Sequence, residues 1–418
     1  MDTVDDLMRI LEASELEQLK RSMLNELFDK KVLHKWKFLG KHFLVAVDGT
    51  GVHSYSERHC DNCLTKTYSS FSVTEDNIQL LRENIGDVIA PAKALIGVLF
   101  KKEGKFLSQL KEQLGDFVDQ HRQMLLEAFT VIDKVSYSHQ VLEAKLVCAN
   151  GFSISLGTQW IENPEGDFDK QDCESKAFKR LANQLKRDFP RLPICIVADG
   201  LYPNEPFFET CKNNQWEYVC TFKMGNLPSL RKEIDELKPC NPQNLIEETV
   251  WNGDAKVTRE YTWITQLSYR NISLNWVRCV ERKYDQDGSQ LSKTVFEYVI
   301  SCPVTEKTIR KIIAAGRLRQ KIENEGFNTQ KNLGYGLEHK YSRVSLQASK
   351  NYYQCLQIAH MINQLLELST SMKEKIKSWG TTLKHCWVAL MGFMQYGEID
   401  TEELAAYCKQ RTQYRYQV

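Results

Sequence analysis

The chain has 418 residues, a formal net charge of +1, and 42% hydrophobic and 26% charged side chains, a composition typical of globular proteins. Its 55 lysines and arginines are balanced by 54 aspartates and glutamates, so the protein as a whole is not basic. The 13 scattered cysteines, the acidic N-terminal segment and the lack of a run of about 18 apolar residues predict a soluble, cytoplasmic protein without membrane contact.

The first part of the chain is predicted to pass from helices to a buried strand. Residues 1–40 carry leucines and isoleucines at helical spacing. The apolar run at 43–47 indicates a strand that ends in a tight turn at 48–51. Residues 74–130 have an amphipathic pattern, clearest at 106–129, which predicts a helical insertion that covers a core or forms a dimer contact.

Strands and helices are predicted to alternate up to residue 239. The patterns predict strands at 140–149, 152–161, 192–198 and 218–222, and helices at 170–189, 205–212 and 228–237.

Strand patterns dominate the next segment, and helices dominate the end of the chain. Residues 240–303 hold strand patterns at 261–264, 272–280 and 294–300, and we interpret this segment as a β-rich insertion. From Glu306 onward the patterns are helical, and residues 370–418 predict a packed helical cap with a basic, aromatic tail.

Two of the predicted strands end in an aspartate followed by a glycine. Asp48 follows the run at 43–47, and Asp199 follows the run at 192–198. An Asp-Gly pair at a strand end is most often a turn. Two carboxylates on neighbouring strands also suit Mg²⁺, which prefers oxygen ligands, and a third carboxylate would complete a two-metal site for attack on a phosphodiester.

A third acid follows in residues 317–331, where Arg319 and Glu323 are four apart and share a helix face, with Ile322 and Phe327 free to pack inward. This stretch resembles the R-x2-I-E-N signature of the DDE transposases of bacterial insertion sequences. Further segments that resemble the family, in order, are VAVDGTGVHS, HQVLEAKLV, KQDCESKAFKRL, IVADGLYPN, FKMGNLPSL, NLGYGLEHKYSR and NYYQCLQIAHMINQLLE. They extend from residue 45 to about 367, and 151 residues separate Asp48 from Asp199.

The resemblance implies an α/β fold with a ribonuclease-H-like mixed sheet flanked by helices. The implied segments are an N-terminal helical segment (1–40), a core in two parts (41–239 and 304–367), a β-rich insertion (240–303) and a C-terminal helical segment (368–418).

The resemblance also implies a mechanism, in which Asp48 bridges two Mg²⁺ ions, with Mn²⁺ as a substitute, and Asp199 and Glu323 hold one ion each. The substrate would be double-stranded DNA at element ends and targets, bound by a homodimer or a higher synaptic assembly. Arg319 would contact a DNA phosphate, unless it is a surface partner of Glu323, and Lys223 and Lys331 would contact the DNA backbone.

The signature departs from the family at two positions. The family often has a tyrosine three residues before the arginine and a lysine seven residues after the glutamate, where this chain has Gly316 and Gln330, with Lys331 one place late. Glu325 is therefore a competitor of Glu323, although its side chain would point about 200° away on a helix.

Several alternatives remain open. The chain could be a DDE-fold nuclease or an inactive DNA-binding derivative, or an α/β enzyme that uses Asp199 as an acid–base group on a small molecule. Cys60 and Cys63, with His53 and His59 nearby and with His139 or Cys148 to complete the set, could form a zinc site, which needs four ligands. Trp263 and Trp276 could stack on an unpaired base or pack in a core.

Overall fold

The computed structural model describes residues 2–57, 60–72, 130–164, 166, 170–253, 255–342, 345–409 and 415–416. It divides into two compact units. The first comprises Met1–His53, Cys60–Asn62 and His139–Val418, and the second comprises Ser54–His59 and Cys63–Ser138. The helical insertion predicted at 74–130 lies outside the described residues, except for Thr130, with which a strand begins.

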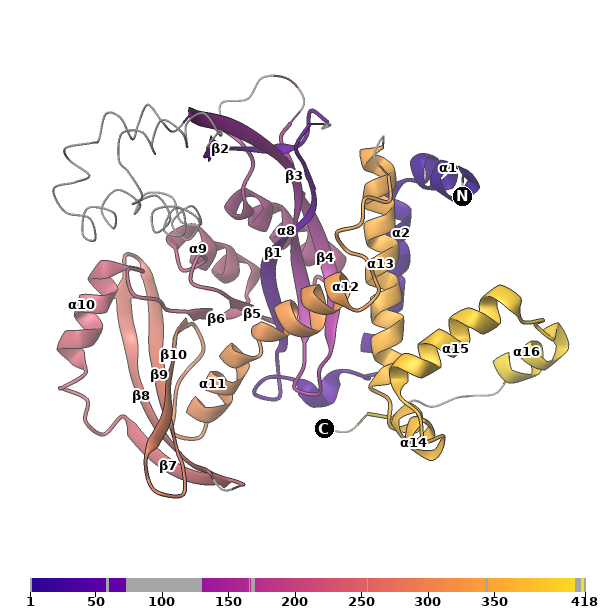
Figure 1. Cartoon of the computed structure of the whole chain (residues 1–418). Coiled ribbons are helices and arrows are strands. Elements are labelled where there is room, and N and C mark those ends of the chain that lie inside the picture. Colours follow the sequence, from indigo (N-terminus) through magenta and orange to yellow (C-terminus); the bar gives the residue numbers. More distant parts are fainter. Residues whose placement is uncertain are drawn as a thin grey trace, which may run out of the picture. The chain divides into compact units, whose positions relative to one another are not determined.

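A large mixed sheet forms the centre of the first unit (Figure 1), so the predicted α/β class is confirmed. Its strands lie in the order β4-β3-β1-β5-β6-β10-β9-β8-β7. Their bounds are β1 Phe43–Tyr55, β3 Thr130–Val147, β4 Ser153–Ile161, β5 Ile194–Ala198, β6 Glu217–Thr221, β7 Leu245–Asn252, β8 Ala255–Tyr269, β9 Ile272–Tyr284 and β10 Gln290–Ile300.

The strand directions change along the sheet. The β1–β5 and β5–β6 pairs are parallel, whereas β3–β4, β6–β10 and all pairs from β10 to β7 are antiparallel. The segment 240–303 therefore forms an antiparallel meander that joins the central sheet through β10. The strands predicted there are confirmed, and each is longer than its sequence pattern indicated.

β1 passes through the place where a tight turn was predicted, and that prediction is wrong. The strand continues through Asp48 and both glycines to Tyr55. Neither Gly49 nor Gly51 has a positive φ, so the backbone stays extended there. A glycine permits a turn but does not require one, and here the ladder of the sheet keeps the chain straight.

Helices cover the sheet on both faces, as Figure 1 shows with α11 (Ile309–Arg317) and α12 (Thr329–Asn332) in front of the strands and α8 (Glu174–Asp188) behind them. One apolar core lies between Leu44, Ala46 and Val197 of the strands and side chains from α11, η3 (Ile322–Asn328) and α13 (Leu346–Glu367). The burial of β1 on both faces is typical of a central strand.

The remaining helices of the first unit complete these layers. The predicted N-terminal helical segment is confirmed as two α-helices and a short 3-10 turn, and the first two pack against α13. The bounds are α1 Asp2–Ile10, α2 Ala13–Asp29, η1 His34–Trp36, α9 Glu205–Asn214 and α10 Pro228–Leu237.

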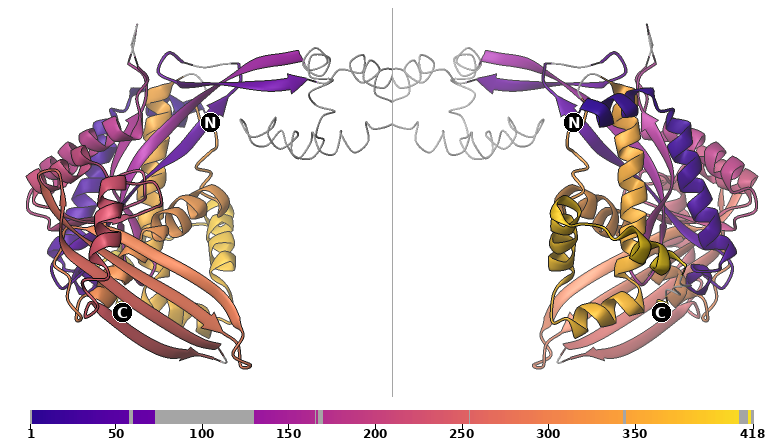
Figure 2. Two further views of the ribbon diagram at one scale, coloured as in Figure 1. Left: turned by 90° about the vertical axis from the view of Figure 1, so that its left-hand side faces the viewer. Right: turned by 90° about the vertical axis from the view of Figure 1, so that its right-hand side faces the viewer.

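The C-terminal helices α14 (Thr370–Ser378), α15 (Leu383–Tyr396) and α16 (Thr401–Cys408) lie at the margin of the first unit (Figure 2). The packed cap predicted here is wrong, because neither α14 nor α15 has a buried residue. α15 instead exposes large apolar side chains, among them Val388, Met391, Phe393, Met394 and Tyr396. Apolar residues around a helix do not by themselves determine which element, if any, packs against that helix.

The second unit contains β2 (Leu64–Ser72) and the first half of β3. They pair antiparallel from Leu64 opposite Ser138 to Ser72 opposite Thr130. Across all residues that the structure describes, no helix has the length and apolar character needed to cross a lipid bilayer.

Candidate active site

Asp48 lies in β1, and Asp199 directly follows the neighbouring parallel strand β5. The pairing of β1 with β5 runs from Phe43 opposite Ile194 to Ala46 opposite Val197, an offset of 151 residues. The same offset separates the two aspartates, which follow the last paired residues, Ala46 and Val197, by two positions each. Adjacent strands are about 4.8 Å apart, and residues at equal positions point to the same face.

Glu323 is brought to Asp48 by an arginine. Arg319 Nη1 lies 3.2 Å from Asp48 Oδ2, and Arg319 Nη2 lies 2.6 Å from Glu323 Oε1. Because the guanidinium is planar and compact, the two carboxylate oxygens lie within about 8 Å of each other. Arg319 therefore contacts both acids and is more than a surface partner of Glu323.

The helix that carries Glu323 is a π-helix. Residues Ile322–Asn328 form this single wide turn, with Ile322 and Phe327 buried as the sequence predicted. The four-residue spacing of Arg319 and Glu323 still joins them, because Arg319 precedes the π segment. Short π segments inside α-helices occur frequently at functional sites, and here the segment lies at the acidic centre.

Glu325, the competitor of Glu323, has a different partner. Its carboxylate pairs with Lys321, one helical turn earlier. Its backbone carbonyl accepts a hydrogen bond from Gln364 Nε2 of α13. Glu323, in contrast, faces Arg319 and Asp48, and its side chain is 46% exposed and open to a ligand. The geometry favours Glu323 as the third acid.

Lys223 lies against Asp199 at the acidic centre. Its Nζ is 3.3 Å from Asp199 Oδ2, and its aliphatic chain covers Gly200. The loop is held by Asn226, whose Nδ2 donates to the Gly200 carbonyl at 2.8 Å, and by the Leu201 N–H, which donates to Asp199 Oδ1 at 2.8 Å.

Lys331 and the two family positions that depart from the signature lie elsewhere. Lys331 Nζ pairs with Glu338 at 2.7 Å. Gln330 is fully buried and bonds to Gln357 of α13. At Gly316 a Cβ would collide with the ring of Tyr298 from β10, so the packing of that ring leaves room for glycine alone.

Two residues of the centre were not predicted as site residues from the sequence. Glu174 is the first residue of α8, and its Oε2 accepts a hydrogen bond from the Tyr202 hydroxyl at 3.3 Å. Both lie in segments that were noted only for their order along the chain. The available signal was positional: Glu174 begins a helix, and Tyr202 lies three residues after Asp199.

The electrostatics of the centre are those of crowded acids. Burial raises the pKa of Asp48 to about 6; the charge of Arg319 lowers it, and the charges of Glu323 and Glu174 raise it further. Burial also raises the pKa of Glu174, an effect that the Tyr202 hydrogen bond opposes and the charge of Asp199 reinforces.

The acidic side chains of the centre offer carboxylate ligands, although in the described residues no three of them have ligand atoms within 4.8 Å of one another. The donors are carboxylate oxygens, which hard cations prefer, and the neighbouring acids destabilise the charged form of Asp48. A bound dication relieves such repulsion. Arg319 and Lys223 provide positive charge beside Asp48, Glu323 and Asp199.

The aromatic and cysteine sites predicted from the sequence lie away from these acids. Trp263 and Trp276 are buried, and the Trp276 indole donates to Glu297, so packing in the core is the role that the structure supports. Within the first unit Cys60 Sγ is 3.3 Å from His139 Nε2. Burial lowers the pKa of His139 to about 4. A zinc site there stays a prediction.

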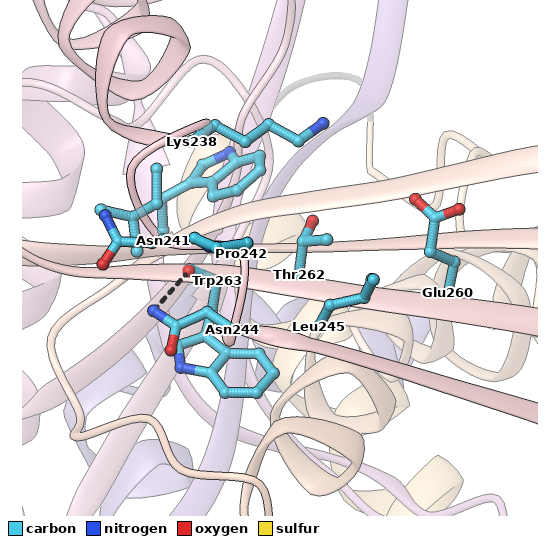
Figure 3. A pocket seen from close by; sticks show the side chains of 10 residues that line it. Lys238, Asn241, Pro242, Asn244, Leu245, Glu260, Thr262 and Trp263 are labelled. Atoms are coloured by element: carbon cyan, nitrogen blue, oxygen red, sulfur yellow. Dashed lines mark hydrogen bonds between the residues drawn. The ribbon is translucent and has the colours of Figure 1, made fainter.

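A separate pocket of about 290 Å³ lies between the loop after α10 and the strands β8 and β9 (Figure 3). Asn244 Nδ2 donates to the Trp263 carbonyl at 3.2 Å on its wall, and Lys238, Glu260 and Thr262 also line it. The pocket shares no residue with the acidic centre.

Comparison with known proteins adds no identity. No protein-family model matches the chain, and a search of the curated proteins finds no match. The functional argument therefore rests on the residues and their geometry.

Proposed function

We propose that the chain is a DDE transposase that cleaves DNA and transfers its strands with the help of two divalent metal ions. The observation that carries the proposal is the convergence of three acids from distant parts of the chain. Asp199 directly follows β5, the parallel neighbour of the strand β1 that holds Asp48, and Arg319 joins Glu323 to Asp48.

The fold supports the proposal in a coarser way. The five strands β4-β3-β1-β5-β6, with helices on both faces, are the part of the sheet that we propose as a ribonuclease-H-like core. The meander β7–β10 enters between Asp199 and Glu323 and extends the same sheet. In this proposal β1 holds Asp48 and the end of β5 fixes Asp199, while η3 supplies Glu323.

Each residue then has a defined task. Asp48, Asp199 and Glu323 would hold the ions, which when bound supply an activated water or DNA hydroxyl and stabilise the leaving oxygen. Arg319 and Lys223 contact these acids, and in this proposal both would bind DNA phosphates beside the ions. No covalent bond between protein and DNA is needed.

The proposal is tested by incubating the protein with Mg²⁺ or Mn²⁺ and two substrates, supercoiled plasmid DNA and linear DNA carrying the sequences that flank its gene. We expect nicking and joining that fall by about 10²–10³-fold or more in Asp48→Asn, Asp199→Asn and Glu323→Gln. Glu325→Gln is the matched control, because Glu325 pairs with Lys321 and should leave cleavage unchanged.

The outcomes separate the alternatives. Cleavage without joining to a target identifies a nuclease, and binding of DNA without any cleavage identifies an inactive derivative. Full activity in any of the three acid variants would overturn the assignment of that acid.

A further inference from the structure

The helix α15 is apolar around its whole circumference. Apolar residues occupy most of its 14 positions, and they lie on every side of the helix. Helices that are apolar on all sides are normally buried. In the described part of the chain, however, nothing buries a residue of α15, and Val388, Met391 and Met394 are 56–68% exposed.

One edge of α15 is held by the first unit. Trp387 Nε1 donates to Glu367 Oε1 of α13 at 2.8 Å, which fixes the helix against α13. At Gly392 nothing lies within 4 Å of the Cβ position, so another backbone could approach closely there. A group of exposed apolar side chains marks a contact surface. We define the α15 surface by its exposed residues Trp379, Val388, Met391, Phe393, Met394 and Ile399.

The charges beside the α15 surface are separated by sign. The segment 373–384, which precedes most of the helix, holds four exposed lysines and one glutamate, namely Lys373, Glu374, Lys375, Lys377 and Lys384. The segment 398–403, which follows the helix, holds four exposed acids and no lysine or arginine, namely Glu398, Asp400, Glu402 and Glu403. The helices that carry parts of these segments, α14 and α16, lie at opposite ends of α15 (Figure 1).

This order of charges fits a second copy of the chain. A two-fold axis through the middle of α15 would place two copies of the helix antiparallel, with each contact repeated by symmetry. The basic segment of one copy would then lie beside the acidic segment of the other, at both ends of the interface. A parallel pair would bring like charges together, and a partner of one charge sign would match one end of α15 and be repelled at the other.

We propose that α15 packs antiparallel against α15 of a second copy across a two-fold axis, with the segment 373–384 of each copy on the segment 398–403 of the other. The pairing buries the α15 surface, and the charged segments fix its direction. The inference goes beyond the proposed function and does not depend on it, because no residue of the acidic centre takes part.

The test measures the association of the full chain by sedimentation velocity over a range of concentrations, without DNA. The parent should form a dimer. Met391→Glu places a charge on the α15 surface and should raise the dissociation constant by about 30-fold or more. Met224→Glu is the matched control, because Met224 is exposed on the loop after β6 and should leave the dimer intact.

Reversing the charges tests the antiparallel direction. Lys375→Glu/Lys377→Glu makes both segments acidic, and Glu402→Lys/Glu403→Lys makes both basic, so each variant alone should dimerise about 10-fold more weakly or worse. A mixture of the two variants should form a heterodimer, because opposite charges then meet at both ends. Lys232→Glu/Lys293→Glu carries the same change of net charge on α10 and β10 and should dimerise as the parent does.

Each outcome decides for or against the pairing. Circular dichroism and thermal unfolding verify that the variants are folded, as expected for substitutions of exposed side chains. A parent chain that stays monomeric overturns the proposal, and so does a dimer that folded Met391→Glu leaves intact. If Met391→Glu dissociates the dimer but the two charge variants do not associate when mixed, the antiparallel direction is overturned.

Discussion

Acidic side chains gather in two regions of the first unit, and the two regions are built in opposite ways. On the meander, Glu248 and Glu281 are surrounded by three arginines. Arg259 contacts both acids, Arg310 Nε lies 2.6 Å from Glu248, and Arg317 Nη1 lies 3.4 Å from Glu281. At the candidate site the three acids Asp48, Asp199 and Glu323 meet two cationic side chains, Arg319 and Lys223.

The pKa values follow this balance. Burial acts to raise the pKa of Glu248, but hydrogen bonds from Tyr261 and Arg310 outweigh it, and the pKa is lowered. For Asp48 burial dominates and the pKa is raised to about 6 despite Arg319. Similar residue types thus stabilise the fold in one place and cost stability in the other, as expected when a site is shaped for a ligand.

The largest expected difference between the two regions is in the sign of the stability change. In EDTA, Asp48→Asn should stabilise the protein by about 1–3 kcal/mol at pH 7, because it removes a carboxylate whose charged form is disfavoured in the fold. Glu248→Gln should destabilise it by about 1–2 kcal/mol, because Tyr261 and two arginines lose a charged acceptor.

Urea unfolding of the two variants and the parent measures both changes. A shift of the free energy of unfolding in the same direction by both substitutions would contradict the proposed difference between the two regions.

The pH dependence sharpens the same contrast. Asp48 has a raised pKa in the fold, so its contribution to stability is complete below the unfolded value near 3.8 and is lost as the pH rises through about 6. The stability gain of Asp48→Asn over the parent should therefore be near zero at pH 3.5 and grow until about pH 6.5. Urea unfolding at several pH values, in EDTA, follows this gain, and a gain that does not change with pH contradicts the raised pKa.

The smallest expected effect is at the exposed edge of the arginine network. Arg310→Gln should cost about 0.5 kcal/mol, because its pair with Glu248 is exposed to solvent and Glu248 keeps Arg259 and Tyr261. DNA cleavage should be unchanged. A loss of cleavage in this variant would mean that the meander network is part of the site.

The sequence predicted many elements because local patterns specify them. The helix at 228–237 has the bounds that its proline start and apolar spacing indicated, and the apolar runs before Asp48 and Asp199 are β1 and β5. Buried strands and amphipathic helices are local properties, which a single sequence shows.

The arrangement of the site was less accessible to sequence reasoning. The spacing of 151 residues between the aspartates is visible in the chain, but the strand register that makes it meaningful is a long-range pairing. The π turn at Glu323 and the approach of Glu174 to Gly49 depend on packing between distant elements. The predicted packing of α15 was wrong because its apolar residues do not determine which partner buries them.

The binding of two Mn²⁺ ions, measured by electron paramagnetic resonance on the complex with DNA, tests the central claim most directly. The parent should bind two ions close enough for spin coupling, about 4 Å apart. Asp48→Asn should lose the coupled pair, because Asp48 is the proposed bridge, and Asp199→Asn and Glu323→Gln should each retain a single uncoupled ion. A coupled pair that persists in Asp48→Asn would contradict the account.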